Sequence, residues 1–291
     1  MRYSRLQTLA VAALMGSPVF AAPPQAAAKT GVTPPANASS NSQAPTWNPA
    51  KQTISFGIAM FPGYEPLDVM GPLQILFRTS MMFPVKLSLI ASAAGPITAL
   101  PPAPELKGAS VAAPVMMATH SFANAPKLDI LLVPGGWGMM ILAQKNDTSI
   151  DNFVKQRMPE LKYLLSVCTG AASLAKAGVL KGKKATTNKS AWKEITTYGE
   201  GITWVPSARW VEDGNIWTSS GVSAGIDMTY AFLSKLYGTK HMNSVMNAME
   251  YAPHTNPNWD PFAATFKVPG ASPDSSTPDC PKPLPETPMN M

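Results

Sequence analysis

YLLSVCTGAA, residues 163–172, is the stretch that decides the fold of this chain. An apolar run of strand length leads to Cys168, and the small residues that follow are typical of a helix start. In a nucleophile elbow the reactive residue lies on a strained turn between a strand and a helix, so the positions two before and two after it must be small. Ser166 and Gly170 meet that requirement. A buried structural cysteine at a strand end fits the stretch equally well, because a free cysteine packs like a small hydrophobic residue.

The rest of the chain alternates between runs of strand length and segments of helical spacing. The apolar run DILLVP, residues 129–134, is typical of a strand buried on both faces of a parallel sheet. Asp213-Gly214 predicts a hairpin within residues 204–218. The alternation predicts βαβ units, and therefore an α/β fold with a mostly parallel sheet. Further strands are expected at 54–61, 85–91 and 164–167, with 115–120 in a β-excursion, and helices at 69–78, 149–157 and 224–237.

The two ends of the chain differ in composition from its middle. The N-terminal residues have a basic start, a short apolar run and a small-x-small pattern, as a secretory signal peptide does. The apolar run is too short for a membrane anchor, which needs ~20 residues. We therefore expect a secreted, extracellular protein whose mature chain begins near Ala22. The expected organisation is a signal peptide at 1–21, a disordered linker at 22–51, a folded domain at 52–251 and a proline-rich C-terminal tail at 252–291.

Composition and charge argue against several classes of partner. The chain has 291 residues, of which 45% are hydrophobic and 14% charged, so it is long and apolar enough to bury a large core. The net charge is +6, but the basic residues are scattered apart from KGKK at 181–184, which we interpret as a solvated turn. We therefore expect no nucleic-acid partner. No pair of His or Cys residues has ligand spacing in the sequence, so neither a metal nor a cofactor is expected.

The chain has two cysteines, Cys168 and Cys280. A disulfide between them would block the elbow, so we expect Cys168 to be a free thiol. Asn37, Asn146 and Asn188 begin N-x-S/T sequons, which are usable only if the host glycosylates exported proteins. Asn188 is the least suitable of the three, because it follows a predicted strand.

Three features converge at the carboxyl ends of the predicted strands, where ligands bind in open α/β folds. Cys168 ends one strand, Gly135-Gly136 end another, and Asp68 follows the first strand by a few residues. A backbone N–H can approach a developing anion where no side chain intervenes, which is the functional interpretation of the two glycines. An ordinary tight turn is the simpler one. Trp137 comes next, and we expect it to line a pocket with Met139-Met140.

The ionisation of this site follows from its expected surroundings. Cys168 at a helix N-terminus would have its thiolate stabilised by the helix dipole, which lowers the pKa of the thiol. Asp68 precedes a predicted helix, so it is either a helix cap or a functional carboxyl, and Glu65 competes for the functional role. Beside a thiolate, burial and like-charge repulsion would raise the pKa of the Asp68 carboxyl and make it a proton donor at neutral pH.

Four motifs together carry a resemblance to a known family. They are FPGYEPLDVMGP (61–72), LDILLVPGG (128–136), SVCTGAASLAKAGVLKGKKATTN (166–188) and RWVEDGNIWTSSGVSAGIDM (209–228). In these motifs the chain resembles the ThiJ/PfpI family of the class I glutamine amidotransferase-like superfamily, over roughly residues 55–251. The resemblance implies a flavodoxin-like three-layer sandwich and a homodimer. It also implies that Cys168 is the nucleophile, that Asp68 is the acid, and that Gly136 and Thr169 offer oxyanion-hole amides.

Two positions separate the activities that this family contains. Members that resemble proteases or deglycases usually have a histidine directly after the cysteine or a glutamate as the acid, whereas this chain has Thr169 and Asp68. The Cys-Thr pair with Asp in L-D-x-x-G-P is similar to the isonitrile hydratases of the family. That similarity implies addition of water to a small-molecule isocyanide to give an N-substituted formamide, with Thr169 orienting or hydrogen-bonding the reacting group.

Two alternatives stay open at this point. A fold hosts many functions, so the chain is alternatively a protein without turnover that binds a small ligand or senses oxidants through its thiol. A hydrolase or deglycase of the same family is the other alternative. His120, His241 and His254 are isolated in the sequence, and we expect none of them to complete a catalytic triad.

Overall fold

The computed structural model describes residues 48–102 and 112–272 of the chain. The expected signal peptide, most of the expected linker, Asn37 and Cys280 lie outside the described residues. Among the described residues Cys168 is a free cysteine.

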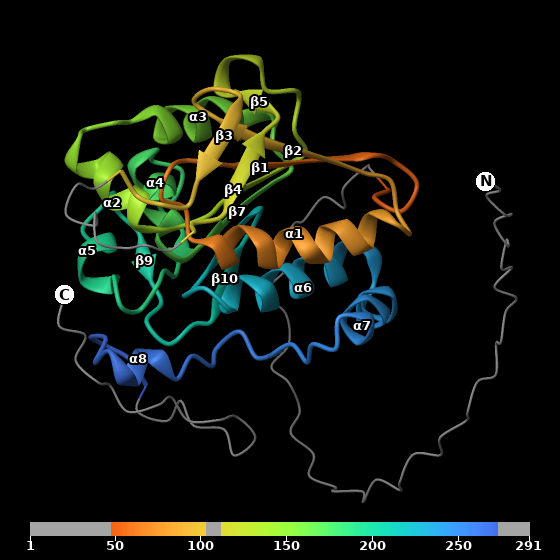
Figure 1. Cartoon of the computed structure of the whole chain (residues 1–291). Helices are drawn as coiled ribbons and strands as arrows, with labels where there is room; N and C mark the ends of the chain where they lie inside the picture. The colour runs from red at the N-terminus through yellow and green to blue at the C-terminus, as the bar shows by residue number, and fades with distance from the viewer. Residues whose placement is uncertain (1–47, 103–111, 273–291) are drawn as a thin grey trace, which may run out of the picture. The chain divides into compact units, whose positions relative to one another are not determined.

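A seven-stranded sheet forms the centre of the described domain (Figure 1). Neighbouring strands run parallel, except for the antiparallel hairpin at one edge, so the predicted α/β fold with a mostly parallel sheet is confirmed. The strands lie in the order β10 (Trp210–Asp213), β11 (Ile216–Ser219), β7 (Tyr163–Val167), β6 (Ile130–Val133), β1 (Ile54–Ala59), β2 (Val85–Ala91) and β5 (His120–Ser121).

Helices cover both faces of this sheet. The helices are α1 (Pro66–Ser80), α2 (Trp137–Gln144), α3 (Ser149–Arg157), α4 (Ala171–Lys176), α5 (Trp192–Ile195), α6 (Ala224–Tyr237), α7 (Thr239–Ala248) and α8 (Phe262–Thr265), with 3-10 turns η2 (Phe122–Asn124), η3 (Met158–Glu160) and η4 (Cys168–Gly170). In Figure 1, α1, α6 and α7 lie together on one side of the sheet and α3 and α4 on the other. Every residue of the central strand β6 is buried, as its unbroken apolar sequence predicts.

Two local predictions differ from the structure. The expected strand at 115–120 is two strands: β4 (Val115–Ala118) pairs with β3 (Gly95–Thr98) in a small antiparallel sheet, and β5 joins the main sheet beside β2. The other small sheet pairs β8 (Lys184–Ala185) with β9 (Thr203–Trp204). Helix α1 begins at Pro66, before the expected Val69, because proline is well suited to the first position of a helix.

The packed part of the domain extends past residue 251, where we expected it to end. Trp259, Ala263 and Val268 are buried, although the segment around them is rich in proline and asparagine. The buried carboxylate of Asp227 accepts hydrogen bonds from the Tyr251 hydroxyl and, in an ion pair, from the Arg209 side chain. Burial of a few apolar side chains against the domain holds this segment in place. Its sequence has no strand or helix periodicity, so the pattern of residues does not predict that it packs.

No helix within the described ranges combines the length and the apolar character needed to cross a membrane.

Candidate active site

Cys168 lies at the turn that connects β7 to η4 and α4. Its φ is +59°, in the left-handed region that residues with side chains rarely adopt, so the backbone at this position is strained. The turn after Cys168 packs closely against the end of β6, since a Cβ atom on Gly170 would lie 2.2 Å from the Val133 carbonyl oxygen. The structure therefore has the predicted strand-turn-helix geometry of an elbow, and packing explains why the position two after the cysteine must be glycine.

The loop that follows β8 contacts Cys168 at two atoms. The side-chain amide of Asn188 donates a hydrogen bond to Cys168 Sγ, with Nδ2 and Sγ 3.2 Å apart. The Thr187 hydroxyl donates to the Cys168 carbonyl oxygen at 2.9 Å. The loop thus fixes both the backbone of the elbow and the position of its sulfur.

The environment of the thiol differs from the expected one. Cys168 is 5% exposed, and burial raises the pKa of its thiol well above the usual value of 9.0, with the charge of Asp68 adding to the effect. Hydrogen bonds from the Thr169 backbone N–H and the Asn188 amide act in the opposite direction. Desolvation outweighs the stabilisation that a helix N-terminus offers, so the expected lowering of this pKa does not occur.

Asp68 is fully buried in the first turn of α1 and does not cap the helix. Its Oδ2 accepts a hydrogen bond from the Gly135 N–H at 2.8 Å, and its Oδ1 has no hydrogen-bond partner among the described residues. Burial raises the pKa of this carboxyl to about 8; the Gly135 N–H lowers it, nearby Glu65 raises it, and the neighbouring Cys168 thiol lowers it. Asp68 is therefore protonated at neutral pH, as the sequence argument expected.

The Gly135-Gly136 turn connects Asp68 to Thr169, the residue that follows Cys168. The Gly136 N–H donates to the Thr169 hydroxyl at 2.9 Å, so this amide is already occupied and is not the open oxyanion donor that we expected. The hydrogen-bond partner of the Thr169 hydroxyl is Gly136 of this turn, so Thr169 stabilises the turn. A Cβ on Gly135 would lie 2.5 Å from the Thr169 backbone nitrogen, so glycine is required there. Of the two expected amides, that of Thr169 is the one that faces the sulfur.

A cavity of about 610 Å³ opens above Cys168. Trp137 is 55% exposed and lines it, as predicted from its place after the two glycines. Asp68 and Gly135 do not line it, since they lie buried next to the elbow. The lining residues are Glu65, Gly136, Trp137, Met140, Ile141, Gln144, Cys168, Thr169, Asn188, Ser190, Ala191, Glu194 and Val222.

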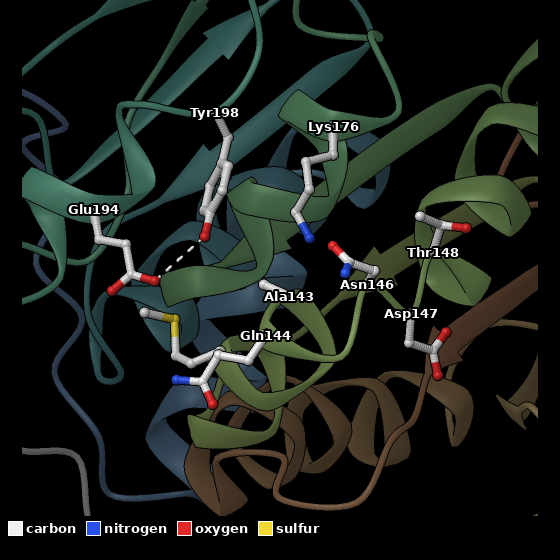
Figure 2. A pocket seen from close by; sticks show the side chains of 9 residues that line it. Ala143, Gln144, Asn146, Asp147, Thr148, Lys176, Glu194 and Tyr198 are labelled. Carbon is white, nitrogen blue, oxygen red and sulfur yellow. Dashed lines mark hydrogen bonds between the residues drawn. The ribbon is translucent and has the colours of Figure 1, made fainter.

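A second cavity of about 320 Å³ adjoins the first (Figure 2). The two share Met140, Gln144 and Glu194 as lining residues. Figure 2 shows the Tyr198 hydroxyl pointing to Glu194, to which it donates a hydrogen bond at 3.3 Å, and the Lys176 side chain extending toward the same space. Lys176 is the last residue of α4, the helix that begins just after the elbow.

Asn188 is the functional candidate that the sequence argument missed. The sequence marks it only as a sequon, although it ends the third of the four family motifs. The signal that would have found it is its position in the loop that follows a short strand, Lys184–Ala185, since loops carry functional side chains in α/β folds. Its link to Cys168 spans 20 residues of sequence, so no local pattern reports it.

No histidine is among the residues that line either cavity. His120 has its ring nitrogen beside the Thr119 hydroxyl, and His241 has its own beside the Tyr237 carbonyl oxygen. Within the described ranges, no group of three or more His, Cys, Asp or Glu side chains is placed to hold a metal ion.

Comparison with known proteins agrees with this geometry. An isonitrile hydratase of Pseudomonas putida is 31% identical over 201 residues, which are 69% of this chain and 79% of the relative. Protein DJ-1alpha of Drosophila melanogaster is 27% identical over 124 residues, which are 42% of this chain and 54% of the relative. The crystal structure of a ThiJ/PfpI family protein from Pseudomonas syringae superposes with a TM-score of 0.59 at 27% identity, and the match covers 73% of this chain and 81% of that one.

Residues 56–235 match the DJ-1/PfpI family, which is more than half of the chain and includes Cys168, Asp68 and Asn188. The flavodoxin-like arrangement of the sheet is shared with the family's solved structures. The chain therefore belongs to the DJ-1/PfpI family.

Proposed function

We propose that the chain is a cysteine-dependent enzyme that adds water to an isocyanide and releases an N-substituted formamide. The observation that carries the proposal is an elbow thiol beside a fully buried carboxyl whose pKa is raised to about 8. A protonated carboxyl at neutral pH is what the reaction needs, because the isocyanide carbon must gain a proton. The 31% identity to an isonitrile hydratase supports the same conclusion.

In the first step, Cys168 Sγ forms a bond to the terminal carbon of the isocyanide. Asp68 gives its proton to that carbon, and the thiol proton passes to the carboxylate. The product is a thioimidate, Cys–S–CH=N–R, and no net charge has been created in the buried site. The hydrogen bond from Asn188 to Sγ favours the developing thiolate, and so does the Thr169 backbone N–H.

In the second step, water adds to the thioimidate carbon. Asp68 accepts the proton of the water on one oxygen while the other gives a proton to the imine nitrogen. The C–S bond then breaks, the hydroxyl becomes the formyl carbonyl and its proton returns to the sulfur. The sum is one isocyanide and one water converted to one formamide, with the enzyme restored.

The test is conversion of a small alkyl isocyanide by the purified protein, followed by NMR detection of the formamide in ¹⁸O-labelled water. We expect the label in the formyl oxygen and at least a 100-fold loss of turnover in Asp68→Asn, since general acid catalysis contributes about 10²- to 10⁴-fold. Cys168→Ala is expected to be inactive. Unchanged conversion by Cys168→Ala would show that this mechanism is wrong.

A thiol sensor is the alternative that the burial of the thiol disfavours. Oxidant sensing needs an exposed, low-pKa thiol, whereas this thiol is 5% exposed and its pKa is raised by burial. Oxidation by peroxide confined to Cys168, together with no turnover of isocyanides or reactive aldehydes, would favour the sensor.

A hydrolase or deglycase is disfavoured by the residue that follows the nucleophile. Thr169 is held by its hydrogen bond to Gly136, and the cavity has no histidine among its lining residues. Aldehyde turnover gained by Thr169→His would support that lineage.

A further inference from the structure

We propose that the second cavity is a distal subsite that takes the positively charged end of a substrate substituent. The inference rests on the proposed function. The shared lining residues place the two cavities next to each other, so a chain attached at Cys168 passes Met140 and Gln144 before it reaches the second cavity. The catalytic cavity alone, at about 610 Å³, is far larger than a simple alkyl isocyanide requires.

The reach from the nucleophile to the subsite sets the length of such a substituent. Lys176 follows Cys168 by eight residues, most of them helical. At ~1.5 Å per residue, the two positions are separated by roughly 12 Å along the helix. A methyl or butyl group does not span this distance, whereas a chain as long as about four extended amino-acid residues does, at ~3.5 Å per residue.

The charges on the lining select the end group. Three carboxylates line the two cavities, from Glu65, Asp147 and Glu194, against the single cation of Lys176. Lys176 already pairs with Asp151 at 3.5 Å, so its charge is largely matched. The chain as a whole has a net charge of +6, which makes this acidic lining a local feature. A carboxylate end group would be repelled here and an ammonium attracted.

Tyr198 adds a specific hydrogen-bonding position. Burial raises the pKa of its phenol, and the charge of Glu194 adds to that effect. The hydroxyl therefore keeps its proton and donates a hydrogen bond to Glu194, which orients the carboxylate at the junction of the two cavities. An ammonium group at the end of a substituent would approach this oriented carboxylate.

The test uses isocyanides with one linear spacer of about 12 Å that end in an ammonium, a methyl or a carboxylate group. We expect kcat/KM to fall in that order, by about fivefold between the ammonium and the carboxylate compounds, which is the factor that an ion pair of about 1 kcal/mol gives. Glu194→Gln should reduce the ratio. Glu200→Gln is the matched control, because it removes the same charge from an exposed residue that lines neither cavity.

The outcomes separate this inference from the proposed function. Equal kcat/KM across the series, or a preference for the carboxylate, would overturn the subsite while turnover of the methyl compound keeps the reaction. If no isocyanide is converted, calorimetry with the matching formamides decides: tighter binding of the ammonium compound supports the subsite without the reaction, and equal binding overturns it.

A second inference concerns the segment after residue 251, which the sequence predicts to be a tail. This segment contacts the loop that follows β8. We infer that Asp260, at the start of α8, is a positioning residue that holds Asn188 against the nucleophile through Lys189. Asp260 lies outside residues 56–235, which match the family. This inference does not depend on the reaction proposed above.

Lys189 is a buried cation at the centre of this connection. Its ammonium donates hydrogen bonds to the Thr186 hydroxyl at 2.6 Å and to the Ala208 carbonyl at 2.9 Å, and it pairs with Asp260 Oδ2 at 3.7 Å. The side chains of both partners are 1% exposed. A buried ammonium without its counter-ion is strongly unfavourable, so the loop needs the carboxylate of Asp260.

The connection to the active site is short. Lys189 follows Asn188 directly, and Thr187 and Asn188 hold Cys168 by its carbonyl oxygen and its sulfur. If Asp260 loses its charge, the Lys189 ammonium keeps its hydrogen bonds to Thr186 and Ala208 but lacks a counter-ion. Its burial then becomes unfavourable, and the backbone that directs Asn188 toward Sγ loses support. The hydrogen bond that favours the thiolate is then lost.

The test is the pH dependence of Cys168 alkylation by iodoacetamide in the full chain, measured on the peptide that contains Cys168 because the chain has a second cysteine, Cys280. We expect the profile of Asp260→Asn to move to higher pH, with a rate about tenfold lower at pH 8, the factor that a lost hydrogen bond to a charged group gives. Asn188→Ala should move the profile likewise, and the double variant no further.

Two further variants decide between positioning and general loosening. Val245→Ala truncates a buried side chain on α7, and we expect it to leave the profile unmoved. Asp260→Glu keeps the charge and should stay close to the wild-type profile. A profile of Asp260→Asn that coincides with the wild type while Asn188→Ala shifts would overturn the inference. If Asp260→Asn does not fold, Ala263→Gly weakens the docking of α8 and serves in its place.

Discussion

Replacing Asp68 with asparagine is expected to abolish turnover and at the same time to stabilise the protein at neutral pH. The carboxyl is fully buried, and desolvation raises its pKa from 3.8 to about 8. Between these values the folded protein keeps a proton that the unfolded chain releases. The contribution of Asp68 to stability is therefore complete below pH 3.8 and is lost progressively as the pH rises toward 8.

The size of this loss follows from the interval of pH. At about 1.4 kcal/mol per unit, the interval from 3.8 to pH 7 corresponds to about 4 kcal/mol of unfolding free energy. Asparagine has no such proton to lose, and its carbonyl oxygen can keep the hydrogen bond from the Gly135 N–H. We expect Asp68→Asn to gain about 2 to 4 kcal/mol at pH 7, or roughly 10 °C in Tm.

The assay is urea and thermal unfolding of both proteins at pH 4, 7 and 8.5. The advantage of Asp68→Asn should be close to zero at pH 4 and grow toward pH 8.5, whereas the exposed control Glu200→Gln should show no such trend. The turnover of the wild type should decline above pH 8, as Asp68 loses its proton. An advantage that is the same at pH 4 and pH 8.5 would refute the reasoning, since Asp68 would then ionise alike in both states.

Three other predictions concern the loop, the turn and the N-terminus. Asn188→Ala should lower kcat about tenfold with little change in KM for a small isocyanide, because the hydrogen bond to Cys168 strengthens as the thiolate forms; an unchanged kcat in steady-state kinetics would contradict this. Gly135→Ala should lower Tm and abolish turnover, since its Cβ would meet the Thr169 nitrogen at 2.5 Å, and a fully active, equally stable variant in a thermal scan would show that the turn adapts. We propose that the N-terminal residues are removed as a signal peptide, so N-terminal sequencing of the protein from its source should find a chain that begins near Ala22, and an intact N-terminus would argue against a signal peptide.

Local patterns in the sequence predicted the fold because they follow directly from burial. A strand buried on both faces must be apolar throughout, as 129–134 is, and a tight turn after a nucleophile must have small residues, as Gly170 shows. The convergence of Cys168 and Asp68 was also predictable, since the carboxyl ends of parallel strands meet at one edge of a sheet. The sequence by itself thus determined the family, the strand-turn-helix geometry at Cys168 and the place of Asp68 beside that cysteine.

Tertiary structure decided what depends on distant partners. The raised pKa of the Cys168 thiol, the occupied amide of Gly136 and the contact of Asn188 with the sulfur all come from groups brought together by folding. So does the burial of Asp260 against Lys189, from a segment that composition alone marked as a tail. The physical reason is that desolvation and hydrogen bonding depend on what surrounds an atom in space, whereas a sequence pattern reports only the periodicity of its own segment.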